Sequence, residues 1–282
     1  MIGSNTGQAA AGGAPLGPKH ALVRQARELA RERKAREEAD LAHMEGVRLV
    51  EEALAAGVEV CYLLYTTELA ERPRGAALLE AAAARGVPLH PVTPEALERA
   101  ADTRTPQGVV GVFRPRSWTL ADLGPGLVLV LDGVQDPGNA GTVIRSLEAM
   151  GGGGAVFAGG VDPYNPKVVR GAMGSLFRLP VLKLPIGEAL AGLRAAGRRI
   201  YLAEAGGALT PWAVDLARGA AAVVGSEAAG PSPEARALAD GVISIPMAGP
   251  TESLNAGVAA SLLAYEAMRQ QGAGAVPPRL SR

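Results

Sequence analysis

The chain has 282 residues, no formal net charge at pH 7 and a single cysteine, Cys61. This length is enough for one large domain or two ordinary ones, and the 48% of apolar residues can supply a sizeable core. One cysteine excludes an intrachain disulfide framework and any site built from several cysteines, and it agrees with a reducing compartment. The balanced charge gives no argument for nucleic-acid binding, although it leaves room for a local basic face.

Metal and membrane signals are missing from the sequence. His20, His43 and His90 do not cluster into a ligand pattern, so we expect no metal site. No apolar stretch is long enough to span a membrane, and the N-terminus lacks the apolar core of a secretory signal. These features predict a cytoplasmic protein without membrane partners.

The N-terminal 40 residues divide into two segments of different composition. Residues 1–18 are rich in Gly, Ala, Ser, Pro and Gln without periodicity, which predicts a disordered tail. Residues 19–40 interleave arginines and lysines with glutamates. The pattern favours a solvated helix with i,i+4 ion pairs, and a basic arm that binds RNA phosphates is the alternative.

Residues 41–113 have the pattern of a small α/β unit. A helical apolar stripe runs from Leu49 to Leu54 and is closed by Gly57, and Thr93 begins a later helix as the N-cap before a proline. Cys61 is predicted to be a buried strand residue. The remaining predicted elements are a helix over 75–85 and strands over 58–65, 87–89 and 107–113. Residues 114–126 lack periodicity and contain prolines and glycines, which predicts a linker.

From residue 127 onward, strands and helices alternate. The predicted strands are 127–134, 155–158, 181–184, 200–203, 220–224 and 242–245. The predicted helices are 140–150, 167–175, 187–196, 233–239 and 254–269. Alternation with nearly continuous apolar strands indicates a mostly parallel sheet that is covered on both faces. We therefore expect an α/β domain over 127–272, followed by a tail over 273–282.

Three loops of this domain follow apolar strands and carry glycine together with polar side chains. The carboxyl edge of an open α/β sheet is where ligands bind, so three such loops indicate a built site. In the first loop, Gln135 to Arg145, Asn139 can cap the following helix, and Arg145 lies off that helix's buried stripe. A capping asparagine and a surface arginine would explain both residues without any function.

The second and third loops also have simple structural explanations. Glu227, between Gly225 and Gly230, can be a loop carboxylate in water. Ser253 is a natural N-cap for the last helix. Asn255 is harder to explain, because asparagine is a mediocre helix former and stands one turn into the predicted helix.

Common nucleotide and hydrolase signatures are absent. No G-x-G-x-x-G follows a strand, and neither G-x-x-x-x-G-K-[ST] nor G-x-S-x-G occurs. These absences argue against a dinucleotide-dependent dehydrogenase, a P-loop NTPase and a hydrolase with a nucleophile elbow.

Taken together, the three loops resemble the SpoU/TrmH family of SPOUT RNA methyltransferases. The matching motifs are Pro137-Gly138-Asn139…Arg145, Gly225-Ser226-Glu227…Gly230 and Ile245-Pro246-Met247…Gly249…Ser253-Leu254-Asn255. The resemblance implies transfer of a methyl group from S-adenosylmethionine to a ribose 2′-hydroxyl of RNA. It also implies a homodimer and a C-terminal α/β domain that contains a trefoil knot.

The N-terminal unit resembles the substrate-binding domain of the same family. The similar segments are Glu45-Gly46-Val47-Arg48 and Thr105-Pro106-Gln107-Gly108, although many members have His where this chain has Pro106. The resemblance thus implies an RNA substrate-binding domain over 19–113. We expect 23S ribosomal RNA as substrate, with transfer RNA, or a non-catalytic RNA-binding protein of the same fold, as alternatives.

The resemblance also assigns residues to roles. Cofactor contacts fall on Gly225, Ile245, Met247 and Leu254, and the catalytic set on Asn139, Arg145, Glu227, Ser253 and Asn255. Lys167 and Arg170 are candidate contacts to RNA phosphates. Arginine is implausible as a free base because its pKa exceeds about 12, so we expect Arg145 to hold the target phosphate and stabilise the developing alkoxide.

Overall fold

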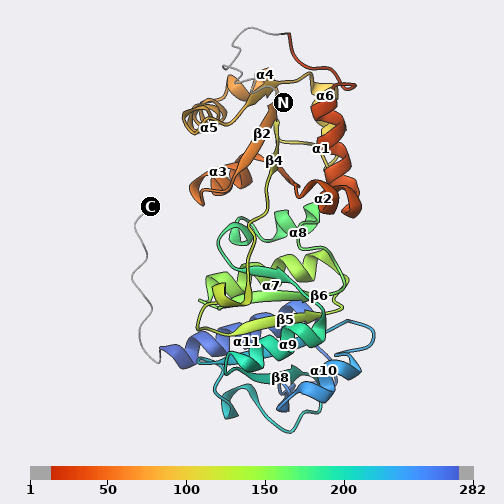
Figure 1. Cartoon of the computed structure of the whole chain (residues 1–282), viewed down its shortest axis with the longest axis vertical. Coiled ribbons are helices and arrows are strands. Elements are labelled where there is room, and N and C mark those ends of the chain that lie inside the picture. The colour runs from red at the N-terminus through yellow and green to blue at the C-terminus, as the bar shows by residue number, and fades with distance from the viewer. Residues whose placement is uncertain (1–13, 273–282) are drawn as a thin grey trace, which may run out of the picture. The chain divides into compact units, whose positions relative to one another are not determined.

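The computed structural model describes residues 14–272 and divides into two compact units (Figure 1). The first comprises Met1–Arg116 and Tyr164–Pro166, and the second comprises Ser117–Pro163 and Lys167–Arg282. Residues 1–13 and 273–282, which include most of the predicted N-terminal tail and all of the predicted C-terminal tail, lie outside the described residues.

The first unit is a four-stranded sheet flanked by helices. Its strands are β1 (Ala42–Glu45), β2 (Val60–Tyr65), β3 (Leu89–Pro91) and β4 (Val109–Phe113). Its helices are α1 (Ala21–Arg31), α2 (Arg33–Ala39), α3 (Val47–Ala55), α4 (Thr67–Ala70), α5 (Pro73–Ala84) and α6 (Pro94–Ala100). The strand order is β1-β4-β2-β3, in which β4 runs antiparallel to both its neighbours and β2 runs parallel to β3.

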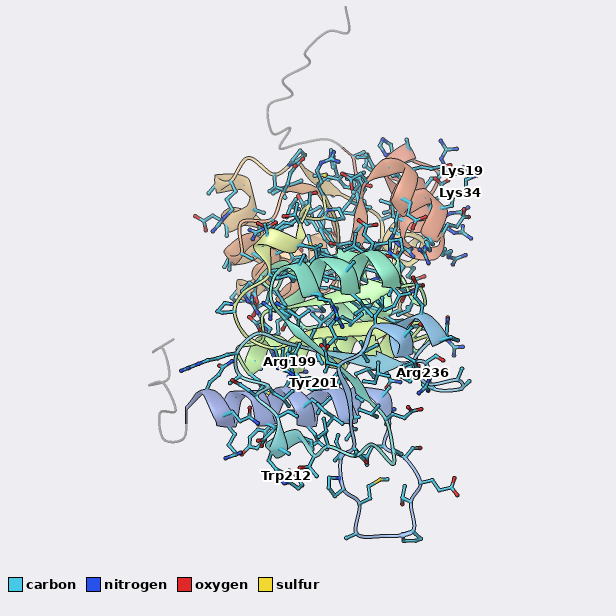
Figure 2. All side chains as sticks on the ribbon, turned by 60° about the horizontal axis from the view of Figure 1, so that its bottom comes forward. Lys19, Lys34, Arg199, Tyr201, Trp212 and Arg236 are labelled. Atoms are coloured by element: carbon cyan, nitrogen blue, oxygen red, sulfur yellow. The ribbon has the colours of Figure 1, made fainter. Side chains whose placement is uncertain are left out.

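The charged N-terminal segment forms two helices of different character. α1 buries Val23, Ala26 and Leu29 in a cluster with residues of α6, β2 and β4, so it is part of the core. α2 carries the predicted i,i+4 ion pairs, Arg33–Glu37 at 2.9 Å and Lys34–Glu38 at 3.6 Å. Figure 2 labels Lys34 on this helix. The solvated-helix prediction therefore describes α2 and misses the buried face of α1.

Several local predictions for this unit need correction. β1 was not predicted, because two of its four residues are polar, and both His43 and Glu45 are buried. Cys61 lies in β2 as expected but is only half-buried. The tail predicted over residues 1–18 includes Leu16, whose N–H donates to the carbonyl of Pro91 at 2.8 Å. Leu16 is therefore paired with the chain that follows β3 and is not part of a disordered tail.

The second unit is built on a six-stranded, fully parallel sheet. Its strands are β5 (Val128–Asp132), β6 (Gly154–Ala158), β7 (Val181–Lys183), β8 (Arg199–Ala203), β9 (Ala220–Gly225) and β10 (Gly241–Ile243). The order is β10-β8-β9-β5-β6-β7. Its helices are α7 (Pro137–Ala149), α8 (Pro166–Gly171), α9 (Ile186–Ala195), α10 (Pro233–Leu238) and α11 (Ala256–Gln271), with short 3₁₀ turns at η1 (Leu120–Asp122), η2 (Ser175–Phe177) and η3 (Pro211–Ala213).

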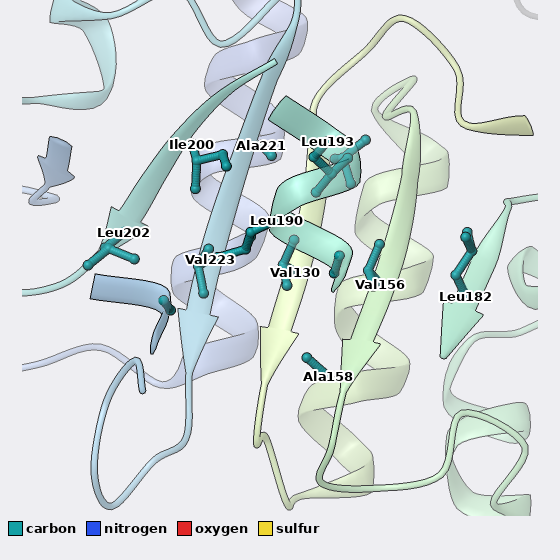
Figure 3. Packing of buried hydrophobic residues seen from close by; sticks show 13 residues of the cluster. Val130, Val156, Ala158, Leu182, Leu190, Leu193, Ile200, Leu202, Ala221 and Val223 are labelled. Atoms are coloured by element: carbon teal, nitrogen blue, oxygen red, sulfur yellow. The ribbon is translucent and has the colours of Figure 1, made fainter. Parts of the chain in front are cut away.

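Helices cover both faces of this sheet, as the continuous apolar strands predict. α9 and α10 pack on one face, where Leu190 and Leu193 lie over Val130 and Val223 of the central strands (Figure 3). α7 and α11 pack together on the opposite face (Figures 1 and 3). The buried core thus holds the strand ends in fixed positions.

The segment predicted as a linker, residues 114–126, is bonded at both ends. Arg114 forms an ion pair with Asp40 of the first unit at 2.9 Å. Further along, Leu120 and Leu123 pack against the core of the second unit, and buried Arg198 donates to the carbonyl of Gly126 at 2.8 Å. Within residues 14–272, no helix is both long and apolar enough to cross a membrane.

Candidate functional site

The three predicted loops start at the carboxyl ends of β5, β9 and β10. All strands of this sheet are parallel, so these ends lie at one edge, with the end of β8 between those of β10 and β9. This edge is where open α/β sheets bind ligands. The loops are therefore neighbours in space, although Asn139 of the first loop lies 88 residues before Glu227 of the second.

A cavity of about 420 Å³ opens at this edge. The four residues predicted as cofactor contacts all line it: Gly225, Ile245, Met247 and Leu254. Three residues predicted as catalytic line it too: Glu227, Ser253 and Asn255. The cavity combines apolar walls with a few polar groups, which is the usual composition of a small-molecule site.

The second loop needs glycine at the point where β9 ends. The loop turns back on itself, with Ser226 and Gly230 exchanging backbone hydrogen bonds of 3.2 and 2.9 Å. A Cβ on Gly225 would collide with the backbone of Gly230 and Pro231. The loop is anchored beyond the turn, because the N–H of Ser232 donates to buried Asp132 at 2.6 Å.

The first loop presents Asn139 to the second loop. Asp136 caps α7 by accepting from the N–H of Asn139 at 2.7 Å, so the prediction that Asn139 is the cap is wrong. The buried Asn139 side chain instead donates from Nδ2 to Oε1 of Glu227 at 2.7 Å. The backbone N–H of Gln135 donates to the other carboxylate oxygen at 3.3 Å. Glu227 is therefore exposed, as a loop carboxylate in water would be, but it also bridges two loops through these hydrogen bonds.

These contacts set the charge of Glu227. Burial raises the pKa of its carboxyl, but the hydrogen bonds from Asn139 and from backbone N–H groups outweigh that effect and lower the pKa below its ordinary 4.5. The group is thus ionised at neutral pH. A carboxylate with a lowered pKa is a weak base near neutrality, so its chemistry is to orient and to accept hydrogen bonds.

The third loop ends later than predicted. α11 begins at Ala256, and its N-cap is Asn255, whose Oδ1 accepts from the N–H of Val258 at 3.2 Å. The prediction that Ser253 is the cap is wrong, and Ser253 remains exposed at the cavity wall. Both residue types are strong caps, so the sequence pattern could not choose between them.

α11 and α7 approach each other closely beside the cavity. A Cβ on Gly257 would lie 3.3 Å from both Cα and Oδ1 of Asn139. The missing side chain at residue 257 therefore allows the start of α11 to lie against the start of α7. This contact places the third loop beside the Asn139–Glu227 hydrogen bond.

The predicted basic residues lie elsewhere. Arg145 is exposed on α7, is not among the cavity-lining residues, and makes no hydrogen bond or ion pair to any residue in 14–272. On α8, Lys167 is exposed and Arg170 is half-buried. The structure does not bring these three side chains into the cavity wall, and their roles stay predictions.

Sequence reasoning missed Glu204. This residue directly follows β8 and lines the cavity, and its carboxylate forms a double hydrogen bond with Arg236 of α10, with both distances 2.6 Å. The only available signal was its position at the end of a predicted strand. The order of the strands, which places β8 between β9 and β10, is what makes that position part of the site.

Comparisons with known proteins agree with this geometry. Residues 126–265 match the SpoU rRNA Methylase family, and residues 21–111 match the MRM3-like substrate binding domain. An uncharacterised tRNA/rRNA methyltransferase of Synechocystis sp. is 33% identical over 259 residues, which cover 91% of this chain and 93% of that protein. The chain belongs to the SpoU family of RNA methyltransferases.

Experimental structures of SpoU methyltransferases share the fold. AviRb from Streptomyces viridochromogenes, in complex with the cofactor AdoMet, has a TM-score of 0.80 and 32% identity, covering 90% of this chain and 98% of that chain. The AdoMet-bound rRNA methyltransferase from Sinorhizobium meliloti has a TM-score of 0.78 and 30% identity, covering 89% and 95%. The predicted family and two-part α/β fold class are confirmed, and the trefoil knot stays a prediction.

Proposed function

We propose that this SpoU-family enzyme transfers a methyl group from S-adenosylmethionine to a ribose 2′-hydroxyl of ribosomal RNA. The observation that carries the proposal is one cavity that residues of the second and third motifs line, while Asn139 of the first motif is joined to it by its hydrogen bond to Glu227. The relatives support the substrate. A 23S rRNA (uridine(2479)-2′-O)-methyltransferase of Streptomyces viridochromogenes is 41% identical over 155 residues, which cover 52% of this chain and 54% of that protein.

A second relative supports the same substrate over a longer alignment. The 23S rRNA (guanosine(2553)-2′-O)-methyltransferase RlmP of Bacillus subtilis is 32% identical over 223 residues, which cover 79% of this chain and 86% of that protein. Transfer RNA is the second candidate, because the Synechocystis relative is named for both RNA classes. A non-catalytic RNA-binding protein is the remaining alternative, and it predicts no cofactor binding.

The residues of the cavity fit S-adenosylmethionine. Ile245, Met247 and Leu254 offer an apolar wall to a flat base, and the close backbone turn at Gly225 offers main-chain groups to polar atoms. When bound, the cofactor supplies an electrophilic methyl group on a cationic sulfur. The protein's part of the reaction is therefore to position the hydroxyl in line and to handle its proton.

The catalytic residues divide these tasks. In the transfer, the ribose oxygen would form its bond to the methyl group as the bond from methyl to the cofactor's sulfur breaks, and the hydroxyl proton would pass to solvent water, because ionised Glu227 is a weak base. Ionised Glu227, held by Asn139, orients the ribose together with Ser253 and Asn255. Arg145 holds the target phosphate and stabilises the developing alkoxide by charge. Lys167 and Arg170 add contacts to neighbouring phosphates.

The first unit offers a basic surface for RNA. Arg24, Arg27 and Arg31 recur at helical spacing along α1, and they make no ion pair to any residue in 14–272. Unpaired arginines on one side of a helix can neutralise RNA phosphates and thereby release the counterions condensed on the RNA. They form a local basic surface, which the zero net charge of the whole chain does not reveal.

The functional form is a homodimer in the cytoplasm. Four large apolar side chains recur along one side of α11 and are each more than a third exposed: Val258, Leu262, Tyr265 and Met268. An apolar stripe on an otherwise packed helix is a typical association surface, and a second copy of this chain would bury it. The stripe begins three residues after Asn255, so the second copy would lie next to the cavity.

The experiment maps 2′-O-methylation on total RNA from cells with and without the protein, and adds purified wild type or Arg145→Ala to the unmethylated RNA. We expect one ribosomal RNA nucleotide to gain a methyl group with the wild type and not with the variant. Methylation of transfer RNA alone would reject the ribosomal substrate. A near wild-type rate from an intact Arg145→Ala dimer would reject the role of Arg145, and failure to bind S-adenosylmethionine would favour the non-catalytic alternative.

A further inference from the structure

Glu204 and Glu227 are the two carboxylates among the cavity-lining residues within 14–272, and no lysine or arginine lines the cavity. Glu227 already accepts hydrogen bonds from the Asn139 side chain and from the backbone N–H of Gln135 in the first loop. Glu204 projects from the end of β8, with its side chain one-third exposed. A Cβ on Gly230 would lie 3.5 Å from Oε1 of Glu204, so the carboxylate lies beside a backbone segment that also lines the cavity.

Arg236 determines what kind of group Glu204 can bind. Its guanidinium donates to both carboxylate oxygens in the bidentate geometry that is typical of arginine (Figure 2 labels Arg236 on α10). The hydrogen bonds from Arg236 outweigh the effect of burial and lower the pKa of Glu204, so the pair consists of two ions with little net charge. Each oxygen still has a free lone pair, because a carboxylate offers about four acceptor sites.

Such a pair favours neutral donors over a cation. Its net charge is close to zero, so it attracts an ammonium group weakly, while its remaining lone pairs can accept from hydroxyl groups at adjacent positions. S-adenosylmethionine carries two adjacent hydroxyls on its ribose. We infer that Glu204 accepts hydrogen bonds from the ribose hydroxyls of the bound cofactor and that Arg236 is the positioning residue that holds it. The inference rests on the proposed cofactor.

The test measures affinity by titration calorimetry on the full chain. The ligands are S-adenosylmethionine, 5′-methylthioadenosine, which keeps both hydroxyls and lacks the ammonium group, and 2′-deoxy-5′-methylthioadenosine. Loss of a hydrogen bond to a charged group weakens binding by about tenfold or more, so we expect Glu204→Ala to lose that much affinity for the first two ligands. Its loss of affinity for the deoxy ligand should be smaller, since one of the two hydroxyl donors is already missing from that ligand.

Matched variants separate this role from a structural one. Glu234→Gln removes an exposed carboxylate of α10 that does not line the cavity and should leave all affinities unchanged. Arg236→Ala leaves the Glu204 charge unpaired, so the preference for cationic S-adenosylmethionine over neutral S-adenosylhomocysteine should rise, whereas damage to the fold would weaken both ligands equally. Thermal melts of each variant verify that it is folded.

The possible outcomes distinguish the inference from the proposed function. Unchanged affinity of Glu204→Ala for 5′-methylthioadenosine overturns the ribose assignment, and a loss confined to S-adenosylmethionine assigns Glu204 to the ammonium group instead. Equal weakening of both cofactor forms by Arg236→Ala overturns the positioning role. A wild type that binds none of these ligands contradicts the proposed function itself.

Discussion

The hydrogen bond between Asn139 and Glu227 joins the first motif to the second, and we predict that it acts as one unit in both stability and rate. The perturbation is Asn139→Ala and Glu227→Gln, made singly and together. A hydrogen bond to a charged group contributes about 1.5–3 kcal/mol when it is buried. Here Asn139 is buried and Glu227 is exposed, so solvent reduces the expected coupling free energy to about 1 kcal/mol.

Denaturant unfolding of the four proteins measures this coupling as a double-mutant cycle. Initial rates of RNA methylation measure the second half of the prediction. We expect each single variant to lose activity by a similar factor and the double variant to lose little more, because residues that act as a unit are not additive. Glu80→Gln, at an exposed carboxylate of α5, is the matched control and should change neither quantity. Fully additive losses in stability and in rate would refute the prediction that Asn139 and Glu227 act as one unit.

The same hydrogen bond predicts a pH dependence. The pKa of Glu227 is lower in the folded protein than its ordinary value of 4.5, so the stabilisation from its ionised form is complete above about pH 4.5. It is lost only as the pH falls through the lowered folded value. An NMR titration of Glu227 should show its pKa rising in Asn139→Ala, because burial persists while the largest lowering contact is removed. An unchanged pKa would contradict the assignment of that contact.

Three further predictions concern the loop, the dimer and the RNA surface. Gly225→Ala should abolish cofactor binding and destabilise the protein by about 1–3 kcal/mol, whereas Gly249→Ala, with open space around its Cβ, should do neither in calorimetry and unfolding. Leu262→Asp should give a monomer of wild-type stability in sedimentation equilibrium, and a persistent dimer would reject the α11 interface. A triple change to glutamine on α1 should lower the slope of log affinity for RNA against log salt by about 2–3, with the ion-paired Arg33 and Lys34 as controls that change it little. The three α1 positions are Arg24, Arg27 and Arg31.

Local patterning was sufficient for the architecture of the second unit. Its central strands β5, β6 and β9 are buried along their whole length and are nearly continuous apolar runs. Segments of helical periodicity alternate with the strands. The same regularity made the loop residues conspicuous, since a polar side chain after such a strand has no role in the core. The four predicted cofactor residues, by contrast, were assigned by the resemblance of these loops to the SpoU/TrmH motifs, and all four line the cavity.

The local sequence pattern could not predict features that depend on residues elsewhere in the chain. The sequence could not decide whether Ser253 or Asn255 caps α11, nor predict β1, whose polar His43 and Glu45 are buried by the rest of the first unit. It could not pair Asn139 with a residue 88 positions away.

The residue types, the strands and the loops are therefore determined by the sequence itself, because they depend on neighbours within a few positions. Which loops share an edge is decided by the strand order β10-β8-β9-β5, which no local pattern contains. That order brings Glu204 into the cavity, and the contact between α7 and α11 at Gly257 places Asn139 beside the third loop. The three loops form one site only in the tertiary structure. The distances between their side chains are set by packing between distant segments, and not by the conformation of any one loop.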